Sequence, residues 1–132
     1  MSDCPCGSGG GYESCCRPYH AGERHAPTAE ALMRSRYSAY ALGEIDYLGR
    51  TLSLLQRKTF DRRMAREWSK QAEWLGLEIV SANGGEGDKA GRVEFIARFR
   101  QGGEEHTHHE ISRFEHVQGR WLYVDGKILG EN

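Results

Sequence analysis

The chain has 132 residues, of which 38% are hydrophobic and 28% are charged, and its formal net charge is −1. Length and composition of this kind are typical of one globular domain with a single core. No apolar run approaches the roughly 18 residues that a membrane-spanning helix needs, and the start Met1-Ser2-Asp3-Cys4 has neither the basic nor the apolar region of a secretory signal. We therefore expect a cytoplasmic protein with no membrane association.

All four cysteines lie within the first sixteen residues, at Cys4, Cys6, Cys15 and Cys16. The glycine-rich segment between the two pairs can fold back tightly, so that four thiolates converge on one ion. Thiolates are soft ligands that zinc prefers, and four of them leave no open position for water. We therefore predict a zinc knuckle over residues 1–25 that binds Zn²⁺ as a structural ion.

Two other uses of the cysteines stay open. Neighbouring cysteines such as Cys15 and Cys16 pair in a disulfide only with strain, and no secretory signal points to an oxidising compartment. An iron–sulfur cluster also takes four thiolates, so the sequence alone does not separate it from zinc. His20 and His25 could replace a ligand, but with four cysteines at hand we interpret both as surface residues.

The clearest helix follows Pro27, with Thr28 as its N-cap and Gly43 as its stop. Its apolar positions recur at three- and four-residue steps and form one stripe, made of Ala29, Leu32, Met33, Tyr37, Tyr40 and Ala41. A shorter helix or helical turn is expected from Glu44 to Leu55, with Ile45, Leu48, Leu52 and Leu55 at similar steps. We interpret both stripes as core, and the two tyrosines as possible walls of a ligand cavity.

A third helix, about Thr59 to Ala72, places Phe60, Met64 and Trp68 along one side. Basic residues gather on another side, and this basic stripe comprises Arg57, Lys58, Arg62, Arg63, Arg66 and Lys70. The basic stripe lacks the interleaved aromatic residues on which single-stranded nucleic acids stack. We therefore interpret it as a solvated helix face and regard nucleic acid as an unlikely partner.

From Trp74 onward the sequence alternates with period two, and glycine-marked turns divide it into four strands. The expected strands are 74–82, 91–101, 104–117 and 120–129, in an antiparallel meander. Three helices followed by such a meander predict an α+β fold, with helices packed on a curved four-stranded sheet.

The third strand contains the densest titratable cluster, His106 to Arg113. Alternation places His108, Glu110 and Ser112 on one face, where His108 and Glu110 could form an acid–base pair. A metal bound through His106 and His108 would lack an identified third ligand. The simplest interpretation is a polar face that meets water or forms cross-strand pairs, such as Glu110 with Arg98. Polar groups that could converge in a cone-shaped cavity are Glu110, Ser112, Arg113, Trp121 and Tyr123, together with Tyr37 and Tyr40.

The run Cys4-Pro5-Cys6-Gly7-Ser8-Gly9, with Tyr12 and Cys15-Cys16, resembles the SEC-C motif, the zinc-binding tail element of the preprotein translocase motor SecA. That element binds the export chaperone SecB. Lysines of that element are replaced here by Gly10, Gly11 and Glu13. The resemblance thus implies zinc binding and a protein partner, but the positive charge that would meet an acidic chaperone is missing.

The chain as a whole resembles the YchJ-like family, in which a SEC-C motif precedes a nuclear transport factor 2-like domain. The segments that carry this resemblance are 27–40, 74–79, 93–95, 109–114 and 119–126. The resemblance implies a cone-shaped (cystatin-like) fold over residues 26–132 and leaves the biochemical role unassigned.

Two functions fit these observations. The first is a protein-interaction or adaptor module that uses the knuckle. The second is a small-ligand-binding protein or enzyme that uses the cone cavity, because this class of fold hosts both binders and enzymes. The sequence contains no nucleophile–base signature, phosphate loop or dinucleotide fingerprint, which makes a non-enzymatic role the simpler expectation.

Overall fold

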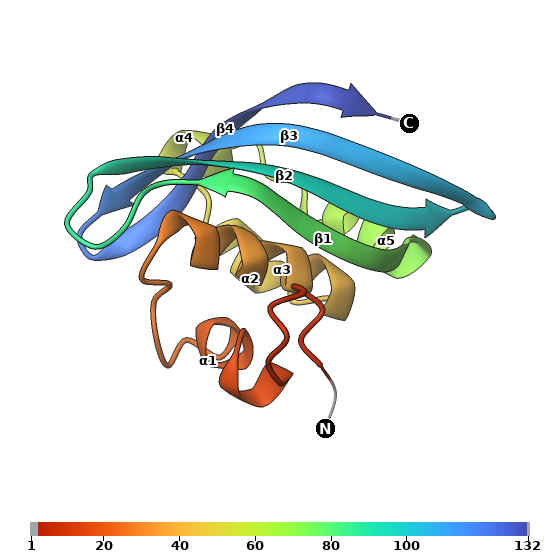
Figure 1. Ribbon diagram of the computed structural model, residues 1–132, viewed down its shortest axis with the longest axis horizontal. Helices are drawn as coiled ribbons and strands as arrows, with labels where there is room; N and C mark the ends of the chain where they lie inside the picture. Colours follow the sequence, from red (N-terminus) through yellow and green to blue (C-terminus); the bar gives the residue numbers. More distant parts are fainter. Residues whose placement is uncertain (1–2, 132) are drawn as a thin grey trace.

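The computed structural model describes residues 3–131 and has an α+β fold in layers (Figure 1). The helices cover one face of a four-stranded antiparallel sheet of order β1-β2-β3-β4. The N-terminal segment lies on the side of the helices that faces away from the sheet. The predicted fold class is therefore confirmed. The predicted division into 1–25 and 26–132 includes residues 1, 2 and 132, which lie outside the described residues, and the division itself stays a prediction.

The helical elements are η1 (Tyr12–Ser14), α1 (Arg17–His20), α2 (Ala29–Leu42), α3 (Ile45–Arg50), α4 (Leu54–Arg57) and α5 (Arg62–Gln71). The strands are β1 (Glu73–Ala82), β2 (Ala90–Gln101), β3 (Glu104–Val117) and β4 (Arg120–Glu131). Each expected strand has its counterpart, with ends that differ by at most two residues. Among the described residues no helix is both long and apolar enough to span a membrane.

Helix α2 begins and ends where the sequence predicts. The Thr28 hydroxyl accepts a hydrogen bond from the Ala31 amide at 3.0 Å, and Gly43 closes the helix with φ of 79°, a conformation that glycine adopts without strain. The buried face is wider than the predicted apolar stripe, because Ser35, Arg36 and Ser38 are buried as well. These polar side chains are satisfied by internal hydrogen bonds, and apolar periodicity does not reveal such residues.

The helix predicted over 44–55 is wrong in its second half. The backbone pairs with β4 instead: Tyr123 donates to the Thr51 carbonyl and Ser53 donates to the Tyr123 carbonyl, both at 2.8 Å. Leu52 is buried at this crossing, whereas Leu55 in α4 is 75% exposed. A helical ladder cannot continue through residues whose amides and carbonyls bond a strand.

Helix α5 starts later than predicted, after its N-cap Asp61. Ala65 and Ser69 form its buried positions, and Met64, predicted on the apolar side, is 66% exposed. The Ser69 hydroxyl donates to the Tyr40 carbonyl at 2.5 Å, which ties α5 to the end of α2. The helix therefore packs through the small residues Ala65 and Ser69 as well as through the ring of Trp68, and periodicity of large apolar residues misses the small ones.

The sheet turns one face of each strand toward the helices. In β3, Glu110, Ser112 and Phe114 are buried on this face, while register shifts after His109 and Arg113 bend the pairing with β4. The expected cross-strand pair of Glu110 with Arg98 is wrong. Glu110 lies opposite Phe95, and Arg98 lies opposite Thr107. The largest fully buried side chains of the core are Trp121, Phe114, Leu32, Leu48 and Val93.

Candidate functional site

The four cysteines come together at the N-terminus. Their sulfur atoms all lie within 4.8 Å of one another, and three of the side chains are buried, with Cys15 partly exposed. The Sγ atom of Cys15 lies 3.6 Å from that of Cys6 and 3.9 Å from that of Cys16. Zinc–sulfur bonds of about 2.3 Å place tetrahedral ligands about 3.8 Å apart. The cluster therefore has the donor set and the spacing of a tetrahedral thiolate site and could hold a metal ion.

The loop geometry that produces this cluster depends on glycine. The Cys4 amide donates to the Gly10 carbonyl at 2.9 Å, and a bridge between Asp3 and Gly11 closes the segment into a small hairpin. At its bend Gly7 has φ of 78°, and a Cβ there would lie 3.3 Å from the Leu77 carbonyl oxygen of β1. Only glycine meets both conditions, so Gly7 sets the return of the chain that brings the two cysteine pairs together.

The protonation of the cluster fits a bound cation. A hydrogen bond with the Cys16 thiol lowers the pKa of Cys6 to about 4, and the same bond raises the pKa of Cys16. Burial raises the pKa of Cys4 to about 11. Neighbouring buried thiolates repel one another, so one thiolate suppresses the ionisation of the next. A cation at the centre removes this conflict and lets all four sulfurs bind as thiolates.

One hydroxyl supports the partly exposed ligand. The Ser8 hydroxyl lies 3.2 Å from the Cys15 sulfur and accepts a hydrogen bond from the Gly10 amide at 3.2 Å. Hydrogen bonds of this kind orient metal ligands and tune their charge. The pattern of cysteines and glycines does not indicate a supporting hydroxyl, so Ser8 is a residue that sequence reasoning missed.

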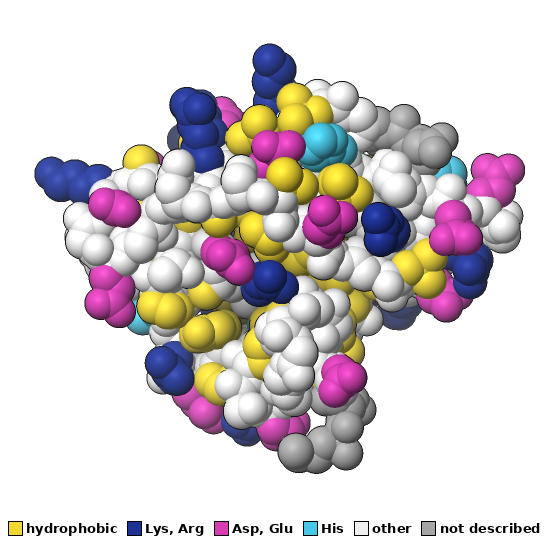
Figure 2. Space-filling view, in the orientation of Figure 1, with side chains coloured by type: hydrophobic (Ala, Val, Ile, Leu, Met, Phe, Trp, Pro, Cys, Tyr) yellow, Lys and Arg dark blue, Asp and Glu magenta, His cyan; other side chains and the backbone are white. Residues whose placement is uncertain are grey.

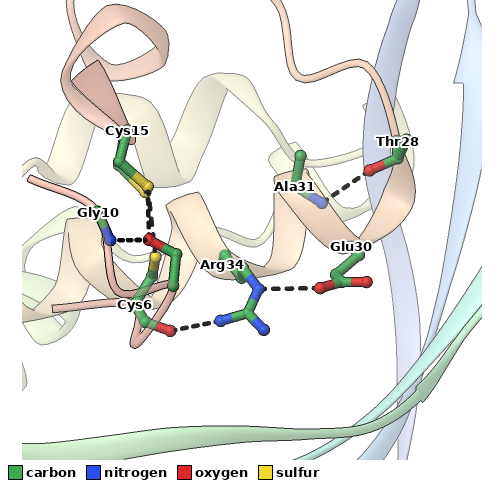
Figure 3. Close-up of polar contacts among 9 residues, drawn as sticks. Cys6, Gly10, Cys15, Thr28, Glu30, Ala31 and Arg34 are labelled. Carbon is green, nitrogen blue, oxygen red and sulfur yellow. Dashed lines mark hydrogen bonds and ion pairs between the residues drawn. The ribbon is translucent and has the colours of Figure 1, made fainter. Parts of the chain in front are cut away.

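Arg34 of α2 attaches the cysteine loop to the helical layer (Figure 3). Its Nη1 atom donates to the Cys6 carbonyl at 2.8 Å, and its Nε atom donates to Glu30, one turn earlier on α2, at 3.0 Å. The cysteine loop therefore has a fixed position on the helix. In the sequence Arg34 is one of several arginines off the apolar stripe, and nothing in the pattern distinguishes it.

His20 is buried, which corrects its interpretation as a surface residue. Its Nε2 atom lies 2.8 Å from the Ser35 carbonyl oxygen, and its Nδ1 atom lies 2.8 Å from the Tyr12 hydroxyl. The carbonyl can only accept, so Nε2 carries a proton. Burial lowers the pKa of His20, which favours the neutral ring. His20 thus joins Tyr12 to α2 and is no part of the sulfur cluster, while His25 is exposed.

A second candidate site is a cavity of about 330 Å³ between the helices and the inner face of the sheet. We call it the cone cavity. Side chains from α2, α5 and the first three strands form most of its wall, and the segment from Leu52 to Asp61 forms one side. Its lining includes Arg36, Tyr37, Tyr40, Trp68, Trp74, Phe95, Phe99, His108, Glu110 and Tyr123.

Glu110 is the centre of a polar network in this cavity. Its Oε1 atom accepts from His108 Nε2 at 2.7 Å, and its Oε2 atom accepts from the Ser112 hydroxyl at 2.5 Å and the Tyr123 hydroxyl at 2.9 Å. Burial works to raise the pKa of Glu110, but the three hydrogen bonds together outweigh it and hold the pKa below its ordinary value. The carboxylate is therefore charged at neutral pH.

The structure separates the seven candidate cavity residues. Tyr37, Tyr40, Glu110 and Tyr123 line the cone cavity, and Ser112 lies behind Glu110. Arg113 does not belong to this group, because it lies on the opposite face of β3, paired with Asp125 at 2.5 and 2.7 Å. Trp121 packs in the core at the far end of α2, where its Nε1 donates to the Pro27 carbonyl at 3.2 Å. The sequence did not indicate which face of β3 points inward, and this caused the misplacement of Arg113.

Arg36 is the cavity residue that sequence reasoning missed. Its side chain is buried, and its Nη1 atom donates to the Leu48 carbonyl at 2.8 Å and the Thr51 hydroxyl at 2.7 Å. Its guanidinium carbon lies 5.0 Å from the centre of the Tyr123 ring. A buried arginine inside an apolar core is uncommon, and here the helix C-terminus of α3 and a tyrosine ring accommodate its charge.

Comparisons with known proteins agree with this arrangement. The family described as "YchJ, middle NTF2-like domain" matches residues 28–126. The UPF0225 protein GSU1048 of Geobacter sulfurreducens is 48% identical over 124 residues, which are 93% of this chain and 77% of that protein. The names of these relatives state no activity.

Two solved structures are similar over nearly the whole chain. The solution structure of RPA3114, a SEC-C motif containing protein from Rhodopseudomonas palustris, has a TM-score of 0.89 and 43% identity, and the match covers 98% of this chain and all of the other. The crystal structure of a SEC-C motif containing protein from Psychrobacter arcticus has a TM-score of 0.82 and 31% identity, covering 96% of this chain and 82% of the other.

Proposed function

The chain belongs to the YchJ-like family of SEC-C motif proteins, and we propose that it is a protein-interaction module whose recognition surface is built around a structural Zn²⁺. The observation that carries the proposal is the convergence of four cysteine sulfurs within 4.8 Å in a segment outside the helical layer. A site of this kind shapes a surface, because four sulfur ligands leave no open position for a reacting molecule.

Zinc is the ion that the donor set favours. The ligands would be Cys4, Cys6, Cys15 and Cys16, and the sulfur–sulfur distances of 3.6 and 3.9 Å match the edge of a zinc tetrahedron. When bound, zinc supplies the positive charge that four thiolates need and the folding energy that a polar, glycine-rich segment lacks. Free thiols used in this way suit a reducing compartment, which supports a cytoplasmic location.

The surface offered to a partner is the outside of the cysteine loop. Ser8, Gly9, Gly10, Glu13 and Ser14 are exposed there. Glu13 forms an ion pair with Arg17 at 3.3 Å, and four thiolates around Zn²⁺ would keep a net negative charge, so the loop is weakly acidic. Such a surface is suited to a polar or weakly basic protein partner rather than to the acidic chaperone that the SEC-C element of the translocase motor meets.

The basic stripe gives little support to nucleic acid as a partner. Arg62 forms an ion pair with Asp46, and Arg63 pairs with Glu67 at 3.4 Å. Arg57 donates to the Leu52 and Arg50 carbonyls, both at 3.1 Å. On the face shown in Figure 2, basic and acidic side chains are interspersed. Internal partners and mixed charge both weaken attraction to phosphate.

The test compares surface variants that leave the cysteines intact. We expect the full chain, used as bait with in-cell cross-linking, to capture a defined protein. The double variant Glu13→Lys with Ser14→Asp should lose this protein, while its metal content, measured by elemental analysis, stays at one zinc per chain. The matched control is Lys127→Glu with Asp125→Lys on the outer face of β4, which should keep the partner.

Two results would contradict the proposal. If the double variant Glu13→Lys with Ser14→Asp still captures the same protein, the cysteine loop is not the recognition surface, even if the metal is present. Iron with inorganic sulfide in place of zinc, visible as a strongly coloured protein, would replace the structural ion by a redox cluster.

A further inference from the structure

We propose that the cone cavity binds a neutral, planar aromatic molecule that carries a hydrogen-bond acceptor such as a carbonyl group. The cavity volume of about 330 Å³ is comparable with that of small-molecule sites. Its lining combines a wall of aromatic rings with a few buried polar groups, which is the composition that selects a small organic ligand. This proposal is independent of the metal centre and of the partner that the cysteine loop recognises.

The aromatic wall consists of four rings in mutual contact. Trp68 lies 5.1 Å from Tyr40, 5.0 Å from Trp74 and 5.7 Å from Phe99, measured between ring centroids. All four side chains line the cavity and are partly exposed, although they lie between a helix layer and a sheet. If neighbouring side chains filled this part of the core completely, the four rings would be buried. The rings therefore offer apolar faces and edges that a flat aromatic molecule can cover.

Two hydrogen-bond donors lie on the cavity wall contributed by α2. Arg36 is held by its Nη1 bonds to Leu48 and Thr51, which fix the guanidinium in place. The Tyr37 side chain is 3% exposed, and its hydroxyl lies near the Gly76 backbone but has no hydrogen-bond partner of normal geometry among the described residues. A buried hydroxyl without a partner is costly, and a ligand acceptor would satisfy it.

The charges in the cavity favour a neutral ligand. The positive Arg36 and the negative Glu110 both line it, and Asp61 adds an exposed carboxylate at its edge. Both oxygens of Glu110 already accept hydrogen bonds from His108, Ser112 and Tyr123. A carboxylate ligand would face Glu110 and Asp61, and an ammonium ligand would face Arg36. Neither charge would be fully compensated in a buried site, so both ions should bind more weakly than a neutral amide.

Three probes of nearly equal shape test this reasoning: indole-3-acetamide, which is neutral, indole-3-acetate, which is negative, and tryptamine, which is positive. The readout is the indole N–H signal of the three tryptophans in ¹H–¹⁵N spectra of the full chain. Trp68 and Trp74 line the cavity, whereas Trp121 is buried elsewhere and serves as an internal control. We expect the amide to shift the Trp68 and Trp74 signals saturably, with a Kd at least tenfold lower than that of either ion.

Variants locate the binding site. Ala97 lies on the cavity wall, and Ala97→Phe should fill the space and abolish the shifts. Tyr37→Phe removes only the unpartnered hydroxyl and should raise the Kd of the amide severalfold without affecting the fold. Arg36→Gln should raise it tenfold or more, and Arg113→Gln on the outer face is the matched control that should leave it unchanged. If Ala97→Phe or Arg36→Gln does not fold, the Kd of the amide for Tyr37→Phe decides whether the cavity is the binding site.

Three outcomes would overturn the proposal. The first is that no probe shifts the Trp68 and Trp74 signals up to its solubility limit, which would make the cavity a packing defect. The second is an unchanged Kd in Ala97→Phe, or in Tyr37→Phe, which would place the binding elsewhere. The third is binding of the acetate or the amine as tight as that of the amide, which would exclude a neutral ligand class.

Discussion

At Gly126, on β4, the structure has no room for a side chain. A Cβ atom there would overlap the carboxylate of Glu110 and lie 2.8 Å from the Tyr123 hydroxyl. At Gly130, four residues later on the same strand, a Cβ would have no neighbour within 4 Å. We expect Gly126→Ala to lower the free energy of unfolding by about 1–3 kcal/mol, and Gly130→Ala to change it by less than about 0.5 kcal/mol. Urea unfolding of both variants measures these free energies. Equal losses in the two variants would show that the Glu110 and Tyr123 side chains can move aside at little cost.

Glu110 should make stability depend on pH at the acid end. Its pKa is lower in the folded chain than in the unfolded chain, so the unfolded chain binds more protons as the pH falls. The stabilisation is fully present above the ordinary carboxyl pKa of about 4.5 and is lost as the pH falls through the lower folded value. Glu110→Gln should be less stable at pH 7 and should show a shallower loss of stability below pH ~4.5. If the free energy of unfolding had the same pH dependence in the unmodified chain and in Glu110→Gln, this role of Glu110 would be contradicted.

Single residues show clearly what the sequence could predict. The grouping of the four cysteines follows from residue types, and strand alternation places His108 and Glu110 on one face. The preferred interpretation of that face as solvated is wrong, because Glu110 and Ser112 are buried. The inward-facing Arg36 does not follow, because its burial depends on a carbonyl from α3 and a ring from β4, which are distant in sequence. Pattern analysis therefore misses charged residues that are buried because groups distant in sequence bind their charge.

The same contrast holds for whole elements. The start and end of α2 are predicted correctly, because the Thr28 cap and the Gly43 stop act within one turn of the helix. The break between α3 and α4 is not predictable locally, since the amide of Ser53 bonds β4 instead of continuing a helix. Local signals therefore predict the ends of elements well, except where a strand distant in sequence forms hydrogen bonds with the backbone amides and carbonyls.

Arg34 gives a prediction at the level of the contact between the cysteine loop and α2. Its bond to the Cys6 carbonyl holds a residue that we propose as a metal ligand. Arg34→Met removes the bond while keeping much of the aliphatic stem, and we expect a metal affinity about tenfold lower, as for other supporting contacts. Competition with a chromogenic chelator measures the change. Arg66→Met, at an exposed position of α5, is the control, and equal affinities in the two variants would show that the loop holds its metal without α2.

Across the whole molecule, the order of helices and strands and their α+β arrangement follow from periodicity and turn residues. The position of the cysteine loop on the helices does not, because it depends on a few polar contacts and on the close approach of Gly7 to the Leu77 carbonyl of β1. The main core and the cysteine cluster are two separate groups of buried side chains. The contacts between them include the bonds of Arg34 to Cys6, His20 to Ser35, and Arg50 to the Tyr19 and His20 carbonyls.

Removal of the metal should therefore disorder the cysteine loop and leave the sheet folded. The sheet and α2 bury their own core, whereas the loop depends on its ligands for order. We expect a strong chelator, or Cys15→Ser, to release one metal ion per chain and to collapse the amide signals of residues 3–20, with the signals of β1–β4 kept in ¹H–¹⁵N spectra. Thermal stability should fall modestly, because α2 loses its outer contacts. Ser14→Ala, beside Cys15 but with its side chain exposed, is the control that should keep both metal and loop. Collapse of the β-sheet signals together with those of the loop would instead show that the metal centre holds the entire fold together.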